Sequence, residues 1–340
     1  MATQRYNSGI QRAKGLLEIA AGLYDTSLSH QTERAAEGVL QTDTRVGRVL
    51  RLSLGIRSAQ RTDDVPVSFA TGSFREIVAV AEGKYSLAWV NPSVLLTLAH
   101  RGKGPFKKRL PLRTIANFPS FDVMGFAVHE STGITSFKEI KQQRIPLRVS
   151  TGYVPKSDFA GSSTMFTVSA VLRAAGFSLT DIRKWGGKIH SVSRPSDPSR
   201  RAAIENGTIN AIFDEGIKSW GQTALDNGFR YLPIDGTVLK RMATLGYRPT
   251  GMSRCGFRGM AREVQTIDFS GWPMIVRADM PDEVAYALCE AIEKRAESIP
   301  TDNFKALNIA QLCANDDEAP YDAPLHPGAQ RFYRERGHLK

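Results

Sequence analysis

Apolar residues recur along the chain in short runs and in helical periods, and this pattern predicts an α/β protein. The run VPVSFAT (65–71) is rich in β-branched and aromatic residues, as is typical of a buried strand. FREIVAVAEG (74–83) then carries apolar residues at helical spacing behind Ser73, a natural N-cap. YSLAWV (85–90) is a second buried strand. Strand, helix and strand in this order are typical of the βαβ unit of a parallel sheet.

A second alternating set lies in the middle of the chain. LRVSTG (147–152) and INAIF (209–213) have the composition of buried strands, and a capped helix with an apolar stripe (161–176) lies between them. Residues 114–130 form one long strand-like segment, interrupted only at Pro119 and Ser120. A segment of this length can pass from one sheet to another, so we expect two sheets and two domains.

The two ends of the chain complete the predicted elements. Residues 1–45 predict a helix over 9–23 and then a polar connector, and a first strand follows over 48–56. Toward the other end of the chain we expect a strand over 268–278 and an amphipathic helix over 281–299. Residues from Asp316 onward are polar and proline-rich, and we expect them to be irregular.

Composition narrows the class of protein without identifying it. The 340 residues suit two compact domains, and no apolar run approaches the roughly 18–20 residues that cross a bilayer. The net charge is +11, and residues 100–113 hold six Lys or Arg and no acid. No helix-turn-helix, zinc-finger or RNP pattern accompanies them, so we expect no nucleic-acid partner. The three cysteines are not spaced for zinc, and no H-E-x-x-H, G-x-S-x-G, P-loop or G-x-G-x-x-G motif occurs. We expect no cofactor, no metal site and no catalytic residue.

Several segments together resemble the TAXI family of solute receptors that serve TRAP transporters. They are VPVSFATGSFREIVAVAEGKYSLAWVNPS, GITSFKEIKQQRIPLRVSTG, AAIENGTINAIF and VRADMPDEVAYALCEAI, and the likeness extends over residues 46–300. The resemblance implies a two-lobed type II periplasmic-binding-protein-like fold, in which two Rossmann-like domains are joined by a two-strand hinge. Domain I would comprise 1–121 and 235–340, with 1–45 as an N-terminal helical extension, and domain II would comprise 122–234. A ligand would lie in the cleft between them.

The resemblance also implies what the protein binds. Its ligand would be a small organic anion, a carboxylate or an amino acid, and its other partners would be TRAP membrane subunits. Receptors of this type are periplasmic, but no signal peptide is visible before the first strand, which indicates a cytoplasmic protein if the chain starts at Met1. The alternatives are therefore a cytoplasmic small-molecule sensor on the same fold and an enzyme of unknown chemistry.

Candidate ligand-binding residues lie where predicted strands end and helices begin, because free N–H groups at helix starts attract anions. Plain N-capping is the alternative for each hydroxyl. The candidates are Thr71, Gly72, Ser73, Asn91 and Ser93 in domain I, and Thr151, Ser162, Ser163, Asp214, Glu215 and Trp220 in domain II.

Asp214 directly follows the INAIF strand, where it would accept a hydrogen bond from a ligand hydroxyl or ammonium, or else cap a helix start. From the sequence we expect Asp214→Ala to weaken ligand binding without lowering the melting temperature of the ligand-free protein. Trp220 would stack on an apolar ligand body or pack at the hinge.

Overall fold

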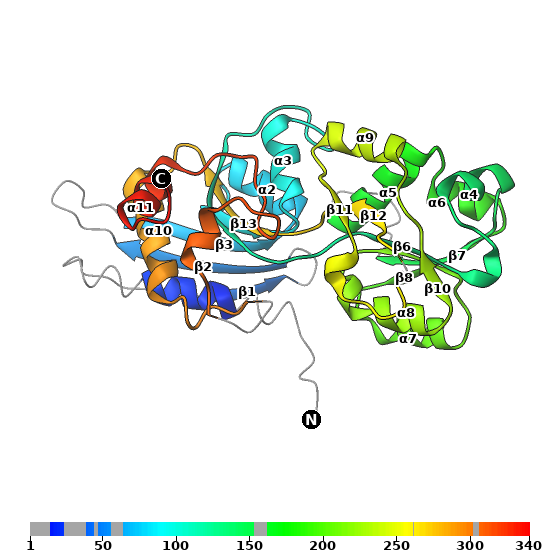
Figure 1. The fold of residues 1–340 in the computed structure, drawn as a ribbon. Helices are drawn as coiled ribbons and strands as arrows, with labels where there is room; N and C mark the ends of the chain where they lie inside the picture. Colours follow the sequence, from blue (N-terminus) through cyan, green and yellow to red (C-terminus); the bar gives the residue numbers. More distant parts are fainter. Residues whose placement is uncertain are drawn as a thin grey trace, which may run out of the picture. The chain divides into compact units, whose positions relative to one another are not determined.

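The computed structural model describes residues 14–23, 39–43, 47–55, 64–152, 162–260, 262–301 and 306–340, those from 39 to 72 through their backbone alone. The chain divides into two compact units. Unit 1 comprises Met1–Phe121 and Ser270–Lys340, and unit 2 comprises Asp122–Phe269 (Figure 1). No helix among the described residues combines the length and apolar character needed to cross a bilayer.

Unit 1 is built on a mixed sheet in the order β1-β2-β3-β4-β13-β5. Only the β3–β4 pair is parallel, and the other neighbours are antiparallel. The strands are β1 (Val39–Asp43), β2 (Gly47–Gly55), β3 (Asp64–Gly72), β4 (Leu87–Val90), β5 (Leu112–Phe118) and β13 (Trp272–Arg277).

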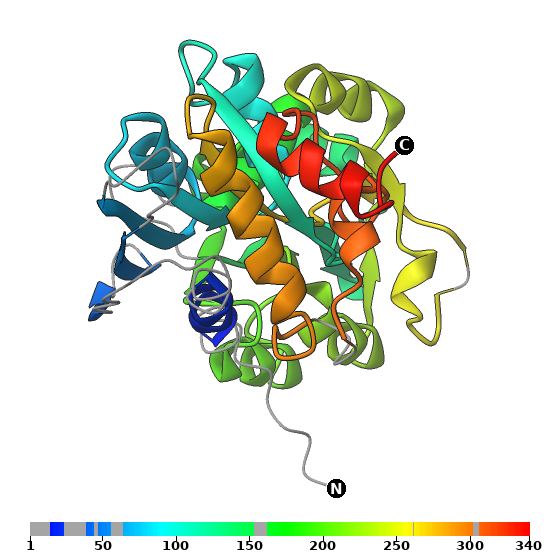
Figure 2. The same ribbon diagram turned by 90° about the vertical axis from the view of Figure 1, so that its left-hand side faces the viewer.

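Helices of unit 1 cover this sheet and enclose its core. They are α2 (Phe74–Ala81), α3 (Val94–Arg101), α10 (Asp282–Lys294), α11 (Pro327–Glu335), the 3-10 helix η4 (Ile309–Cys313) and the helical residues 14–23. Figure 2 shows α10 and α11 beside each other, and their buried side chains share one hydrophobic cluster with β4, β5 and residues 14–23. At Gly22 a Cβ would come within 2.2 Å of the Ala291 carbonyl oxygen, so this helix packs backbone to backbone on α10.

Unit 2 has a five-stranded sheet in the order β10-β6-β9-β7-β8, with β7 parallel to both β8 and β9. Its strands are β6 (Gly125–His129), β7 (Arg148–Gly152), β8 (Lys188–Val192), β9 (Ala211–Asp214) and β10 (Phe229–Tyr231), with a separate hairpin of β11 (Pro249–Gly251) and β12 (Gln265–Ile267). The antiparallel strand β6 lies between β9 and β10.

Helices lie on both faces of the unit 2 sheet, α4, α5 and α6 on one and α7 and α8 on the other (Figure 1). The helices are α4 (Phe137–Gln143), α5 (Ser163–Ala175), α6 (Leu179–Lys184), α7 (Pro198–Glu205), α8 (Gly221–Asp226) and α9 (Gly236–Leu245), with 3-10 turns η1 (Glu130–Thr132), η2 (Ile217–Ser219) and η3 (Ser253–Cys255). The predicted class is confirmed: the chain has an α/β fold in two units, and its backbone passes twice from one unit to the other.

Three predictions at the level of elements were wrong. The second crossing lies between Phe269 and Ser270 rather than at 235, because β10, α9 and the β11–β12 hairpin belong to unit 2. β1 lies inside the expected polar connector, of which 24–38 and 44–46 fall outside the described residues, as do 9–13 of the first predicted helix. The expected irregular tail contains α11, because Ala329, Phe332 and Tyr333 give it a buried face.

Candidate ligand-binding site

The carboxyl ends of three parallel strands meet in unit 2. Ser150 on β7 pairs in register with His190 on β8 and with Ile212 on β9, two residues before Asp214. Parallel strands bring their carboxyl ends to one edge of a sheet, where ligands bind in open α/β folds. The chain continues from β8 into α7, and Ser162, the N-cap of α5, lies ten residues after Gly152.

A buried ion pair joins two of these strand ends to α7. The Arg200 guanidinium donates through Nη2 to Asp214 Oδ2, through Nε to Ser150 Oγ at 3.1 Å and through Nη1 to the Pro195 carbonyl oxygen at 3.1 Å. Arg200 and Asp214 are each 1% exposed. Asp214 Oδ1 accepts from the Glu215 N–H at 2.9 Å. Because both charges have hydrogen-bonded partners, the pair is tolerated in the interior.

Burial and the Arg200 charge shift the pKa values of the groups in this network. Burial raises the pKa of Asp214, and the Arg200 charge and its hydrogen bond act to lower it. Burial and the Arg200 cation lower the pKa of His190, whose Nδ1 lies 3.1 Å from Ser150 Oγ. Ser150 accepts from Arg200 and is fully buried, so its hydroxyl links the strands and is not presented to solvent.

The amino end of α5 lies against the end of β7. Ser162 caps the helix, since its Oγ accepts from the Met165 N–H at 3.2 Å. A Cβ added to Gly152 would lie 3.5 Å from Thr164 Cγ2 and 3.8 Å from Asp214 Oδ1, so Gly152 lies between the first turn of α5 and the ion pair. The N–H groups of a first helical turn have no acceptor within the helix and favour an anion.

The remaining predicted residues of unit 2 are divided between the interior and the strand ends. Thr151 is buried, and its hydroxyl lies 3.5 Å from Met165 Sδ. Trp220 is buried, and its indole N–H donates to the Glu215 carbonyl oxygen at 2.9 Å. Ser163 and Glu215 are partly exposed. Ser163 is the first residue of α5, and the cap of this helix is Ser162.

Asp122 holds the loop that follows β9. Its Oδ2 accepts from the Gly216 N–H at 3.0 Å, its Oδ1 from the Val123 N–H at 2.8 Å, and its carboxyl shares a hydrogen bond with Glu215. Burial raises the pKa of Asp122 to about 6, against the opposing effects of these hydrogen bonds and of the Lys218 cation. The Asp122 carbonyl oxygen also accepts from the Phe269 N–H at 2.9 Å, which ties the two crossing segments together.

In unit 1 the predicted residues lie at the ends of β3 and β4. Thr71 and Gly72 are the last residues of β3 and are described by their backbone alone. The Ser73 N–H donates to Glu76 Oε2 at 2.7 Å, as the capping pattern predicts. Asn91 Nδ2 donates to the Gly271 carbonyl oxygen at 3.1 Å. The side chain of Ser93 is turned to the interior, where its Oγ accepts from Asn117 Nδ2 at 2.9 Å.

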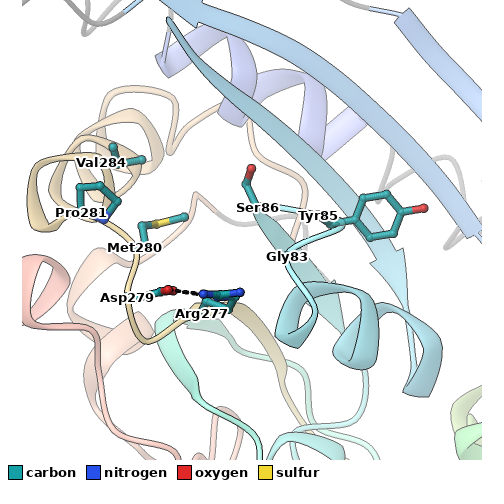
Figure 3. A pocket seen from close by; sticks show the side chains of 8 residues that line it. All are labelled: Gly83, Tyr85, Ser86, Arg277, Asp279, Met280, Pro281 and Val284. Atoms are coloured by element: carbon teal, nitrogen blue, oxygen red, sulfur yellow. Dashed lines mark hydrogen bonds and ion pairs between the residues drawn. The ribbon is translucent and has the colours of Figure 1, made fainter. Parts of the chain in front are cut away.

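A small surface pocket of unit 1 lies at the other end of the sheet (Figure 3). It encloses about 180 Å³ and is lined by Gly83, Tyr85, Ser86, Arg277, Asp279, Met280, Pro281 and Val284. Arg277 Nε donates to Asp279 Oδ1 at 2.8 Å, so the charges that line this pocket satisfy each other. Ligand pockets are commonly at least 300 Å³. This pocket lies where β4 begins and β13 ends, since the two strands are antiparallel. The predicted residues Asn91 and Ser93 follow the opposite end of β4.

The residues that build the unit 2 network were largely missed from the sequence. Arg200, Ser150 and His190 were not among the site residues predicted from the sequence. One signal was present. Arg200, Ala203 and Ile204 lie at helical spacing, and all three are buried on one face of α7. An arginine on the apolar stripe of a helix requires a buried partner. Among the described residues, no group of three or more His, Cys, Asp or Glu side chains could hold a metal ion.

Comparison with known proteins gives a family and distant structural likenesses. Residues 53–337 match the model of the family described as NMT1-like. The solved structure of a periplasmic transporter is 16% identical, with 78% of this chain and 80% of that chain covered and a TM-score of 0.32. A TctC solute binding protein from Polaromonas is 13% identical over 76% and 79%, with a TM-score of 0.35. A Prochlorococcus marinus protein in complex with methylphosphonate is 12% identical over 77% and 82%, with a TM-score of 0.36.

Proposed function

This chain belongs to the NMT1-like family, and we propose that it is a solute-binding receptor that holds a small organic anion without covalent chemistry. The ligand class is a carboxylate or an amino acid. The observation that carries the proposal is the amino end of α5 beside the neutralised Arg200–Asp214 pair, at the carboxyl end of β7.

The charge balance at this strand end suits an anion. Asp214 would repel a carboxylate if it were free, but its charge is paired with Arg200 and withdrawn from solvent. The first turn of α5 then offers backbone N–H groups and the Ser163 hydroxyl as donors, and the helix dipole adds about 0.3–1 kcal/mol in favour of negative charge. A bound carboxylate would therefore gain hydrogen bonds at a site that is already organised.

Strand ends of unit 1 supply further proposed contacts. Gly72 and Ser73 precede α2, and Asn91 follows β4 with an amide that can donate or accept. Thr71 and Ser93 are also proposed contacts, although the Ser93 hydroxyl accepts a hydrogen bond from Asn117. Thr151, Asp214, Glu215 and Trp220 remain proposed as residues that shape the unit 2 site.

We further assign the receptor to TRAP-type transport, on the TAXI-like segments whose order and spacing it carries. Its partners would then be TRAP membrane subunits. Uptake assays with such subunits test this assignment separately from ligand binding. Uptake that depends on the receptor supports it, and binding without any receptor-dependent uptake would refute the transport role alone.

Binding itself is tested with a pair of serine variants on α5. Ser163→Ala removes a hydroxyl from the first turn without removing the cap, whereas Ser169→Ala makes the same change further along the helix. We expect Ser163→Ala to weaken binding of carboxylate ligands in titration calorimetry by about three- to tenfold, the effect of one hydrogen bond. Ser169→Ala is expected to bind as the wild type does. Equal affinities in all three proteins would refute the placement of the ligand at α5.

Gly152→Val probes the same place by filling it. The new side chain would lie between Thr164 and Asp214, where the ligand carboxylate is proposed to bind. We expect loss of binding with an intact circular dichroism spectrum. Unchanged binding by Gly152→Val would contradict the proposed site.

A further inference from the structure

The last residue of α3 and the loop that leads from it toward β5 in unit 1 carry a dense set of cations that the proposed binding function does not use. We call this segment the basic loop and define it as residues 101–109, with Arg101, Lys103, Lys107, Lys108 and Arg109 as its cations. Lys107, Lys108 and Arg109 are consecutive, and all three are exposed.

The basic loop is a fixed structure that displays these side chains. The Lys103 N–H donates to the Leu98 carbonyl oxygen at 2.9 Å, and the Leu110 N–H to the Ala99 carbonyl oxygen at 3.0 Å. Phe106 is buried, with its ring 5.8 Å from that of Phe74. At Gly102, which has a positive φ of 66°, a Cβ would come within 2.6 Å of the Arg109 backbone nitrogen. The loop therefore folds closely on the end of α3.

The cations of the basic loop differ in their ion-pair partners. Arg101 Nη2 pairs with Asp322 Oδ2 at 2.7 Å. In the part of the chain that the structure describes, no carboxylate forms an ion pair with Lys107, Lys108 or Arg109. The cations also act on the neighbouring His100. Burial is the largest effect that lowers the pKa of His100, and the Arg113 and Arg109 charges lower it further.

The fold accounts for only part of this charge. Arg101 lies in the last turn of α3, where a cation favours the negative end of the helix dipole. Lys107, Lys108 and Arg109 lie beyond the helix and outside that interaction. Keeping three like charges adjacent and without acidic partners costs electrostatic free energy, which an anionic surface would offset.

We propose that the basic loop docks the protein onto an anionic phospholipid surface. Clusters of Lys and Arg bind acidic head groups through additive attraction, without a need for exposed apolar side chains. The loop fits this description, since Phe106 is buried and no aromatic side chain is exposed among the residues that the structure describes. Stacking on nucleic-acid bases requires exposed aromatic residues, and protein interfaces are depleted in lysine. A lipid surface is therefore the partner that the residues favour.

Vesicle co-sedimentation of the full chain tests the proposal with two matched triple variants. Lys107→Gln, Lys108→Gln and Arg109→Gln together remove the three exposed cations. Lys138→Gln, Lys141→Gln and Arg144→Gln remove three exposed cations from α4 and its C-cap in unit 2, with the same change in net charge. The probes are phosphatidylcholine vesicles with and without phosphatidylglycerol, and duplex DNA at equal phosphate concentration.

We expect the wild type and the α4 variant to bind the vesicles that contain phosphatidylglycerol and neither of the other two probes. This binding should weaken at high salt. The basic-loop variant should need on the order of a hundredfold more anionic lipid for half-binding. Equal loss in both variants would show a net-charge effect and overturn the proposal. Equal or tighter binding to DNA, lost in the basic-loop variant, would assign the loop to nucleic acid and overturn it. So would the absence of vesicle binding by the wild type.

Discussion

Replacing Asp214 by Asn should destabilise the protein strongly even when no ligand is present. The substitution leaves Arg200 buried at 1% exposure with a neutral partner in place of its carboxylate. Breaking a buried ion pair by removing one charge costs about 3–5 kcal/mol. That loss is a large share of the roughly 5–15 kcal/mol by which folded domains are stable. The structure thus reverses the expectation drawn from sequence, in which Asp214→Ala left the melting temperature unchanged.

Urea unfolding, followed by circular dichroism, measures the effect, and α7 itself supplies the control. Arg201 and Glu205 form an exposed i,i+4 pair at 3.1 Å on the same helix. Glu205→Gln should change the free energy of unfolding by no more than about 0.5 kcal/mol. A double variant, Arg200→Met with Asp214→Leu, removes both charges and should recover most of the lost stability. If Asp214→Asn costs no more than Glu205→Gln, the buried network does not support unit 2 and the reasoning fails.

Three further predictions concern the N-cap of α5, the buried Asp122 at the crossing between the units and the close approach of Gly271 to the Ser93 side chain. Ser162→Ala should lower the free energy of unfolding by about 0.5–2 kcal/mol in urea titrations, since an N-cap is lost; no change would show that α5 needs no cap. The Asp122 pKa of about 6 lies above its unfolded value, so the folded state holds the proton more tightly. The free energy of unfolding should then fall between pH 4.5 and pH 7 by roughly 1–3 kcal/mol, and Asp122→Asn should remove this pH dependence; a variant that keeps the same slope would refute the assignment. Gly271→Ala should destabilise far more than Gly207→Ala, because both have a positive φ but only the former places a Cβ within 2.1 Å of Ser93 Oγ; similar melting temperatures for the two variants would contradict this contact.

Local signals in the sequence were sufficient for individual elements. The β3–α2–β4 unit, the capped start of α5 and the start of α10 follow from short-range patterns that the chain satisfies by itself, although the structure was needed to identify Ser162 as the cap of α5. These features depend on neighbours within one or two helical turns, so periodicity and capping chemistry determine them.

Features that depend on distant neighbours could not be predicted in the same way. Two examples are the antiparallel pairing of β2 with β3 and the passage between the units at Phe269. Both depend on which strands pair in the folded chain. Arg200 and Asp214 are 14 residues apart, and only the fold shows that they form a buried ion pair in which Arg200 also donates to Ser150. A strand-end acid was correctly expected at Asp214, but its partner was not.

Native mass spectrometry of the freshly purified protein is the most direct test of the proposed function. We predict a co-purified small anion that leaves on mild unfolding, that rebinds in titration calorimetry and that is recovered chemically unchanged after prolonged incubation. Conversion of that molecule into a product, or the failure of the ligand-free protein to bind any carboxylate or amino acid, would contradict the account.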